Sequence, residues 1–323
     1  MLANRTRKSH AHLAPRMERE GIGAWRLYDR DIPEVRAIVD VYAGTPADDP
    51  AAPAQVHIVL SEHARQQTEG TPYLDVLADA LAGALALPRA HVHTRARRTR
   101  PREGDRYTQL GARALRLHVP EDGARYVVNL SDYVDTGLFA DMRPLRARIR
   151  AEAAGQTVLN LFGYTGSFTV AAARGGAKRT LTVDASANWL RVAGENLALN
   201  GVVPVGERPG TTHRLWRVDA REALTELTRM GAAFDTVVLD PPSFSDHGGQ
   251  SLEVQRDHRY LVRASLGLLR PGGTLWFCTN HQRFEPDLLR IPEAASVEDA
   301  TEATVPDDYR NRQVHRCWRI VRA

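Results

Sequence analysis

Lysine is nearly absent from this chain of 323 residues, and several features that mark other protein classes are scarce as well. The 43 basic residues include only Lys8 and Lys178 as lysines, so arginine is the default cation. Cys278 and Cys317 are the only cysteines, too few for a disulfide framework, and the twelve histidines show no metal-ligand spacing. We therefore expect no bound metal and no redox chemistry.

Long apolar runs are also missing. No segment approaches the ~20 apolar residues that a membrane helix needs, and the first twenty residues lack the apolar centre of a signal peptide. Apolar residues nevertheless make up 43% of the chain, which is enough for a substantial core in one large domain or two ordinary ones. We expect a soluble cytoplasmic protein with no membrane partner.

One charge cluster stands out, although the net charge is only +4. Residues 88–106 read PRAHVHTRARRTRPREGDR, with seven arginines against Glu103 and Asp105. Arginine clusters bind phosphates, and guanidinium groups stack on bases. A solvated charged hairpin explains the cluster equally well, because arginine is the default cation here. The candidate RNA-binding residues are Arg95, Arg97, Arg98, Arg100 and Arg102.

Two kinds of hydrophobic pattern divide the chain. Residues 1–130 predict a smaller α+β domain, with a helix over 4–20, strands in RAIVDVYA and VHIVLS, a helix in PYLDVLADALAGALAL and a hairpin in ALRLHVPEDGARYVVNL. In residues 131–323, a helix near RPLRARIRAEAAG is followed by strands that alternate with helices: TVLNLF, TLTVDAS, RLWRVDA, FDTVVLD and TLWFCTN. This alternation is typical of a parallel sheet with helices on both faces.

Open parallel sheets bind ligands beyond the carboxyl ends of their strands. The first of these strands ends in NLFGYTGSF, which lacks the G-x-G-x-x-G of a dinucleotide site. Its Tyr164 and Phe168 would crowd a diphosphate, so a nucleoside without phosphates fits better. The next three strands end in Asp184, Asp219 and Asp240.

Any one of these aspartates could be a helix N-cap, but three together favour a ligand site. S-adenosylmethionine carries a ribose, an adenine amine and an ammonium that suit carboxylates, and its sulfonium suits aromatic faces such as Phe162 or Tyr164. The pattern resembles a class I methyltransferase.

The segment DPPSF at 240–244 resembles the D/N-P-P-[YF] motif of methyltransferases that act on planar nitrogen heterocycles. The prolines fix the backbone, the Asp240 carboxylate can face the base, and Phe244 can stack on it. A strand-terminating turn is the plain alternative. We predict as catalytic residues Asp240, Pro241, Pro242 and Phe244.

Longer stretches carry a closer resemblance. YVDTGLFADMR, LNLFGYTGSFTVAAARGGA, TVDASANWL, LDPPSFS, VQRDH and RNRQVHRCW are similar to the guanine-N7 methyltransferase half (RlmK) of the bifunctional bacterial RlmKL enzymes, which modify 23S rRNA. The resemblance implies a Rossmann-like domain with a mostly parallel seven-stranded sheet whose last strand, VHRCWRIVRA, is antiparallel, preceded by a smaller RNA-contacting domain. It also implies S-adenosylmethionine as cofactor and, as partner, 23S rRNA or a large-subunit assembly intermediate.

Cofactor contacts follow from the same resemblance. It places the methionine end at Asn160, Phe162 and residues 164–167, the ribose at Asp184, and the adenine at Asp219 and Ala220. Asp141 and Arg143, ahead of the first strand, would close the site. Arg143 would pair with the cofactor carboxylate. The full predicted set is Asp141, Arg143, Asn160, Phe162, Tyr164, Thr165, Gly166, Ser167, Asp184, Ala185, Ser186, Asp219, Ala220 and Asp240.

The implied reaction is methylation of guanine N7, whose lone pair needs no base. Catalysis would then come from in-line positioning, worth ~7–11 kcal/mol for well-oriented partners, with Phe244 receiving an unstacked base. Asp240 would orient the base by accepting from the guanine N1–H or amine.

Three alternatives stay open. Cys278 could be the nucleophile of a cytosine-C5 methyltransferase, although a buried small hydrophobe explains it as well. The D-P-P-F pattern also suits methylation of an exocyclic guanine amine. A non-catalytic RNA-binding or ribosome-assembly factor could keep the fold and use the same arginines. The modified nucleotide, the oligomeric state and the roles of Gln255, Arg256 and His258 are not determined by the sequence.

Overall fold

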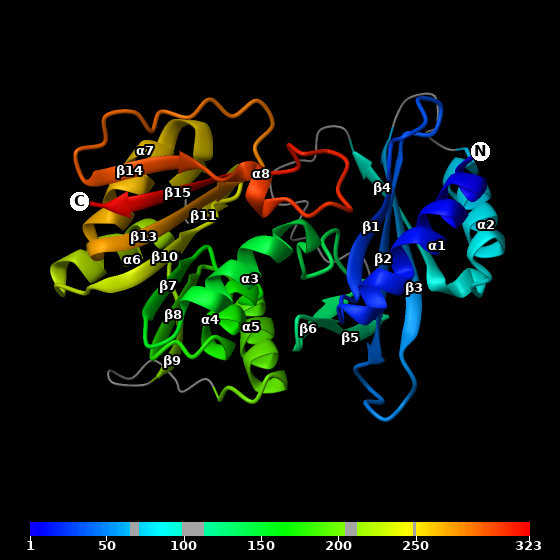
Figure 1. Cartoon of the computed structure of the whole chain (residues 1–323), viewed down its shortest axis with the longest axis horizontal. Helices are drawn as coiled ribbons and strands as arrows, with labels where there is room; N and C mark the ends of the chain where they lie inside the picture. Colours follow the sequence, from blue (N-terminus) through cyan, green and yellow to red (C-terminus); the bar gives the residue numbers. More distant parts are fainter. Residues whose placement is uncertain (65–70, 99–112, 204–211, 248–249) are drawn as a thin grey trace. The chain divides into compact units, whose positions relative to one another are not determined.

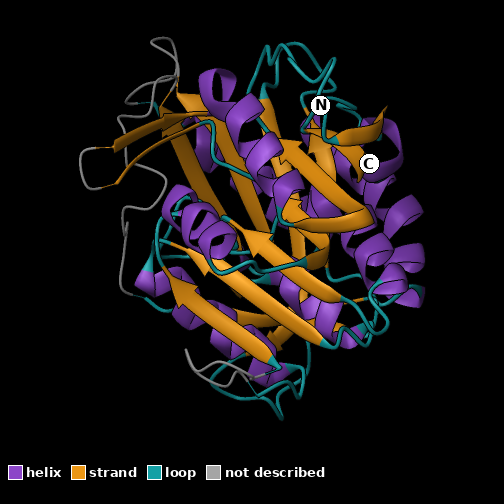
Figure 2. Cartoon of the chain, turned by 90° about the vertical axis from the view of Figure 1, so that its left-hand side faces the viewer, coloured by secondary structure: helices purple, strands orange, loops and turns teal. Residues whose placement is uncertain are grey.

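A computed structural model describes residues 1–64, 71–98, 113–203, 212–247 and 250–323 (Figure 1). The chain forms two compact units: one comprises residues 1–140 with 307–311, and the other comprises residues 141–306 with 312–323. Both are layered α/β structures, as the colouring by secondary structure shows (Figure 2). None of the helices described is both long and apolar enough to cross a membrane.

The N-terminal unit is a six-stranded sheet in the order β4-β3-β2-β5-β6, with β1 paired to β2. Apolar side chains of two helices, such as Met17 and Leu81, pack on one face of this sheet against Val39 and Ile58. The predicted hairpin is confirmed as β5 and β6, whereas β1 and β4 were not predicted. The bounds are α1 Leu2–Arg19, β1 Ala24–Asp29, β2 Ala37–Pro46, β3 Gln55–Ala64, α2 Tyr73–Leu85, η1 Arg89–His91, β4 Val92–Arg98, β5 Arg116–Glu121 and β6 Ala124–Asn129.

The arginine cluster begins inside β4. Arg95 pairs with Ser61 of β3 and is buried, and its guanidinium donates to the backbone carbonyls of Val134 and Asn129. Arg95 therefore stabilises the N-terminal unit through these bonds, and RNA contact by this residue stays a prediction.

The other four candidate RNA-binding arginines stand at the end of β4 or follow it in the sequence. The backbone of Arg97 and Arg98 completes β4. Their side chains, and all of Arg100 and Arg102, lie outside the described residues. RNA contact by these four arginines stays a prediction.

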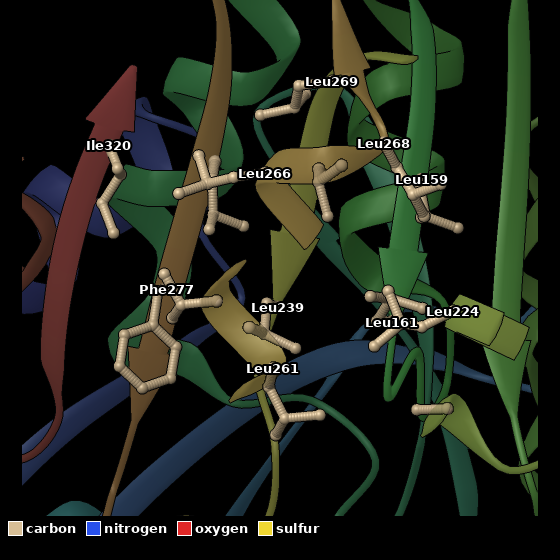
Figure 3. Packing of buried hydrophobic residues seen from close by; sticks show 14 of the residues in the cluster. Leu159, Leu161, Leu224, Leu239, Leu261, Leu266, Leu268, Leu269, Phe277 and Ile320 are labelled. Carbon is tan, nitrogen blue, oxygen red and sulfur yellow. The ribbon is translucent and has the colours of Figure 1, made fainter. Parts of the chain in front are cut away.

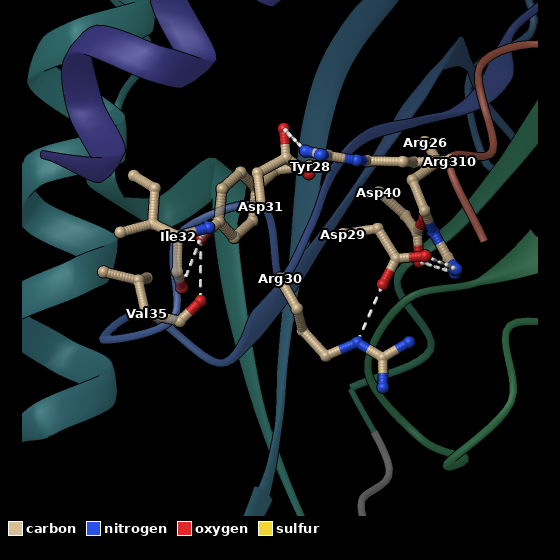
Figure 4. A network of polar contacts seen from close by, with 9 residues as sticks. All are labelled: Arg26, Tyr28, Asp29, Arg30, Asp31, Ile32, Val35, Asp40 and Arg310. Carbon is tan, nitrogen blue, oxygen red and sulfur yellow. Dashed lines mark hydrogen bonds and ion pairs between the residues drawn. The ribbon is translucent and has the colours of Figure 1, made fainter.

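Residues 307–311 return from late in the sequence to the N-terminal unit. The Arg26 guanidinium lies over the Tyr309 ring, 4.3 Å from its centroid, and Tyr309 is buried. Arg310 forms an ion pair of 3.5 Å with Asp31, in the polar network of Figure 4. The chain consequently passes between the two units three times.

The second unit contains a seven-stranded sheet in the order β14-β15-β13-β10-β7-β8-β9. Only β15 runs against the others, since it pairs antiparallel with both β13 and β14. This confirms the Rossmann-like sheet and its antiparallel last strand. The bounds are η2 Ala140–Met142, α3 Arg143–Glu152, β7 Thr157–Leu161, α4 Ser167–Arg174, β8 Arg179–Asp184, α5 Ala187–Leu199, β9 His213–Arg217, α6 Ala220–Arg229, β10 Phe234–Leu239, β11 Phe244–His247, β12 Gln250–Glu253, α7 Val254–Gly267, β13 Leu269–Thr279, β14 Ala294–Asp299, α8 Thr301–Thr304 and β15 Arg316–Arg322.

The central strands carry apolar side chains on both faces because both of their faces are covered. Leu239 and Phe277 face a core shared with α6 and α7, part of which is drawn in Figure 3. Their neighbours Val238 and Trp276 face the opposite side, in a core shared with α3 and α4. Burial on both faces fixes the register of the strands.

Truncation of Phe277 should destabilise this unit strongly. The side chain is fully buried, and its ring lies 5.5 Å from that of Trp318 and 5.8 Å from that of Phe284. Phe277→Ala should lower the free energy of unfolding by about 3–5 kcal/mol in denaturant titrations. Leu289→Ala, at a residue 79% exposed, should change it by less than about 0.5 kcal/mol. Equal effects from the two variants would contradict this account of the core.

Candidate active site

The ends of neighbouring parallel strands bring the predicted site residues to one edge of the sheet. Strands β7, β8 and β10 are level there, since Leu161 pairs with both Val183 and Leu239. The loop after β7 therefore emerges beside Asp184, the last residue of β8, and Asp240, which directly follows β10. The topology thus assembles residues that are far apart in the sequence.

The loop after β7 turns tightly against β8. The Gly163 amide donates to the Val183 carbonyl at 2.9 Å, and a Cβ at this position would overlap the Thr182 methyl group. Gly166 has φ of 72° and precedes α4, whose amino end therefore begins directly behind the loop. Glycine is required at position 163 for close approach of the two strands and at position 166 for the left-handed backbone.

Asp184 holds this loop in a strained conformation. Phe162 and Tyr164 have φ of 57° and 50°, a region in which non-glycine residues are disfavoured by about 1–3 kcal/mol. The Asp184 carboxylate accepts from the Tyr164 amide through Oδ2 at 2.9 Å and from the Ser186 amide through Oδ1 at 2.8 Å. Asp184 therefore joins the loop after β7 to Ser186, the N-cap of α5 (Ala187–Leu199).

Two of the predicted cofactor residues are buried: Asn160 in β7 and Thr165 within the loop that follows it. Asn160 is buried and donates to Thr169 Oγ1 at 3.0 Å. Thr165 is also buried, and its carbonyl accepts from Asn196 Nδ2 at 2.8 Å. Both residues support the loop from inside the unit, and their contact with a cofactor stays a prediction. The same holds for Ser167, at the amino end of α4, and for Ala185, beside Asp184.

Asp219 serves as the N-cap of α6. Its Oδ1 accepts from the Arg221 amide at 2.9 Å and lies 3.3 Å from Arg221 Nε. Asp219 therefore has the N-cap role that was the alternative explanation for a single strand-end aspartate. Adenine contacts by Asp219 and the buried Ala220 stay predictions.

Asp141 has a partner that the sequence did not reveal. Its Oδ2 lies 2.9 Å from His315 Nδ1, and the opposite ring nitrogen of this buried histidine lies 3.1 Å from Thr304 Oγ1. His315 stands in RNRQVHRCW and Asp141 in YVDTGLFADMR, so two of the recognised motifs meet here. Arg143 is buried at the start of α3, and its pairing with a cofactor carboxylate stays a prediction.

The Asp240 carboxyl group lies where ionisation is costly. Desolvation raises its pKa to about 7. The neighbouring His315 opposes this rise, and Asp141 adds a smaller upward contribution. Asp240 keeps part of its surface, whereas Pro241 beside it is buried and Pro242 is partly buried. Rigid prolines thus hold a carboxyl group that changes charge near neutral pH.

The Cys278 thiol is inaccessible. It is fully buried, its Sγ lies 3.3 Å from that of Cys317 on the neighbouring strand, and burial raises its pKa well above the usual value. Among the residues described, no group of three or more His, Cys, Asp or Glu side chains is arranged to hold a metal ion.

Comparisons with known proteins point to one family. The family described as "S-adenosylmethionine-dependent methyltransferase" matches residues 71–306. "Ribosomal RNA large subunit methyltransferase K" of Neisseria meningitidis serogroup B is 37% identical over 98% of this chain and 86% of its own length. "Ribosomal RNA large subunit methyltransferase K/L" of Alcanivorax borkumensis is 40% identical over 99% of this chain. The chain spans only 43% of the length of that K/L protein.

Solved structures share the architecture. The crystal structure of SMU.776 complexed with SAH, a protein assigned as a methyltransferase, superposes with a TM-score of 0.70. The match covers 99% of this chain and 81% of that one at 21% identity. At this identity the likeness shows the fold alone.

The raised pKa of Asp240 predicts a pH-dependent effect of Asp240→Asn. In the unfolded chain the carboxyl ionises near pH 4, but in the folded chain only near pH 7. Folding therefore takes up a proton between these values, and the wild type loses stability as the pH rises through this window. Asp240→Asn should stabilise the protein little at pH 4 and most above pH 7, as measured by denaturant unfolding. Glu298→Gln, at an exposed carboxyl of β14, is the control, and parallel pH profiles for the two variants would contradict the prediction.

A methyl group at position 163 should disturb the loop. Thr182 is fully buried and bonded through Oγ1 to Thr169 at 2.6 Å, so it has little freedom to move aside. Gly163→Ala should lower the free energy of unfolding by about 1–3 kcal/mol. Gly267→Ala, where an added Cβ meets nothing within 4 Å, should cause no loss. Denaturant titration distinguishes the two, and a Gly163→Ala variant as stable as the control would refute the steric argument.

Proposed function

Because this chain belongs to the family of S-adenosylmethionine-dependent methyltransferases, we propose that it methylates a base of 23S rRNA, at guanine N7. The observation that carries the proposal is the meeting of the loop after β7, Asp184 and the DPPSF segment at one sheet edge. The relatives are named as methyltransferases of large-subunit ribosomal RNA, and we propose the same class of substrate for this chain. We place the reaction in the cytoplasm, on 23S rRNA or a large-subunit assembly intermediate.

The chemistry of the loop region fits the cofactor. When bound, S-adenosylmethionine supplies a methyl group on a positively charged sulfur. A carboxylate at the end of this strand accepts hydrogen bonds from ribose hydroxyls, and the bonds of Asp184 to the loop backbone orient it before the ligand arrives. The partly buried rings of Phe162 and Tyr164 offer faces that attract a sulfonium.

Guanine N7 is a suitable methyl acceptor for this site. The N7 lone pair attacks without prior loss of a proton, so the work of the protein is to align nitrogen, methyl carbon and sulfur. The Asp240 carboxyl can accept from the guanine N1–H or amine in either protonation state, because a neutral carboxyl retains acceptor capacity. Its ionised form also stabilises the positive charge that the ring gains on N7 methylation.

The buried thiol argues against methylation of cytosine C5. That reaction requires a thiolate to add to the base, and a reactive cysteine must be accessible and readily ionised. Cys278 is fully buried, and its pKa is raised.

A second candidate is methylation of an exocyclic guanine amine. An amine must lose a proton during methyl transfer, and a carboxyl group with a pKa of about 7 is suited to accept it. This is the observation that favours the amine, and the product of the reaction separates the two candidates.

The deciding experiment uses ribosomal RNA from a strain that lacks the gene. Purified protein and S-adenosylmethionine are added, and the nucleosides are identified by mass spectrometry. We expect 7-methylguanosine from the wild type and from Cys278→Ala, because the thiol has no role in the transfer. Formation of N2-methylguanosine would select the second candidate, and 5-methylcytidine that disappears in Cys278→Ala would refute the N7 proposal. Failure to bind S-adenosylmethionine by calorimetry would leave a non-catalytic RNA-binding factor.

A further inference from the structure

We propose that His281 contacts the target base and selects guanine by donating a hydrogen bond to its O6 atom. This inference rests on the proposed function and adds to it a base-recognition residue beside Phe244. The chemistry recognised is a purine with an acceptor next to N7, which distinguishes guanine from adenine.

Strand topology delivers His281 to the base site. β10 and β13 are parallel neighbours, with Leu239 opposite Phe277, and the chain leaves them at the same edge of the sheet. The DPPSF segment follows β10, and Asn280 with His281 follows β13. Ser243 Oγ joins the two segments through a hydrogen bond of 3.0 Å to Asn280 Oδ1.

Phe244 and His281 form an aromatic corner at this place. Phe244 is 52% exposed, so its ring is accessible to a stacking base. The His281 ring stands beside it, with centroids 5.8 Å apart and planes inclined by 57°. A base that stacks on the exposed face of Phe244 would present its edge to the imidazole.

The surroundings of the imidazole favour one tautomer. His281 Nδ1 is buried and has no hydrogen-bond partner among the residues described. An orphaned buried N–H group is rarer than an acceptor that lacks a donor. A neutral ring therefore carries its proton on Nε2, which makes Nε2 the donor for O6.

The VQRDH motif holds the segment that follows His281. Gln255 forms two hydrogen bonds of 2.9 Å with the backbone of Glu285, one from Nε2 to the carbonyl and one from the amide to Oε1. His258 Nε2 accepts from the Asp287 amide at 2.9 Å. Phe284, directly before the first of these anchor points, packs edge-on against His258 with centroids 4.8 Å apart.

Gln255 and His258 are therefore positioning residues. They fix the backbone on one side of His281, and Asn280 fixes it on the other through Ser243. A base-contacting residue held at both ends is pre-organised, so little conformational freedom is lost when the base arrives.

Two substitutions separate hydrogen bonding from shape. His281→Phe keeps a ring and removes the donor, whereas His281→Gln keeps a donor. With rRNA from the gene-deleted strain, His281→Phe should lower kcat/KM by about 10–100-fold, the range expected for one lost base contact. His281→Gln should stay within about tenfold of the wild type. Binding of S-adenosylmethionine by calorimetry and the melting temperature should not change in either variant. Gln282→Ala, at the exposed neighbouring residue, is the control.

The possible results distinguish a failure of this inference from a failure of the proposed function. A wild type that makes no 7-methylguanosine refutes the proposed function, whatever the variants do. An active wild type with an equally active His281→Phe overturns the role of His281 alone. Equal losses in the Phe and Gln variants, or a loss of cofactor binding in either, would contradict hydrogen-bond donation to the base.

Discussion

The parallel alignment of β7, β8, β10 and β13 is the constraint on which the rest of the catalytic unit depends. Parallel strands are buried on both faces, so their apolar side chains fix the register. Once the register is fixed, the carboxyl ends of β7, β8 and β10 are level, and β13 extends beyond them to Thr279. The charged side chains Asp184 and Asp240 stand at that edge, where the interior ends and the loops begin.

The three strand-end aspartates show how environment divides one residue type among different tasks. Asp184 accepts two backbone amides and stabilises a strained loop. Asp219 caps a helix and lies beside an arginine. Asp240 is desolvated instead, which keeps its charge low near neutral pH. Aspartate at a strand end thus holds a loop, caps a helix or is a candidate for orienting the base, according to the groups that surround it.

The sequence predicted those features that depend on residues close together in the chain. The alternation of strands with helices, the strand-end aspartates and the DPPSF turn are all visible in short windows. Asp141 and His315 are 174 positions apart, and nothing in either segment reports their contact. The role of Gln255 was hidden for the same reason, since its partner is the backbone of Glu285. The bonds of Arg95 were hidden as well, since the carbonyls that accept from it belong to Val134 and Asn129, 39 and 34 positions away.

The return of residues 307–311 to the N-terminal unit has a consequence for how the protein can be divided. One cut near residue 140 leaves residues 307–311 on the C-terminal fragment, although they pack on the N-terminal unit. A gene fragment that starts at residue 141 would also carry Tyr309 without Arg26, the cation that lies over its ring. Neither unit is therefore complete as one continuous segment of the chain.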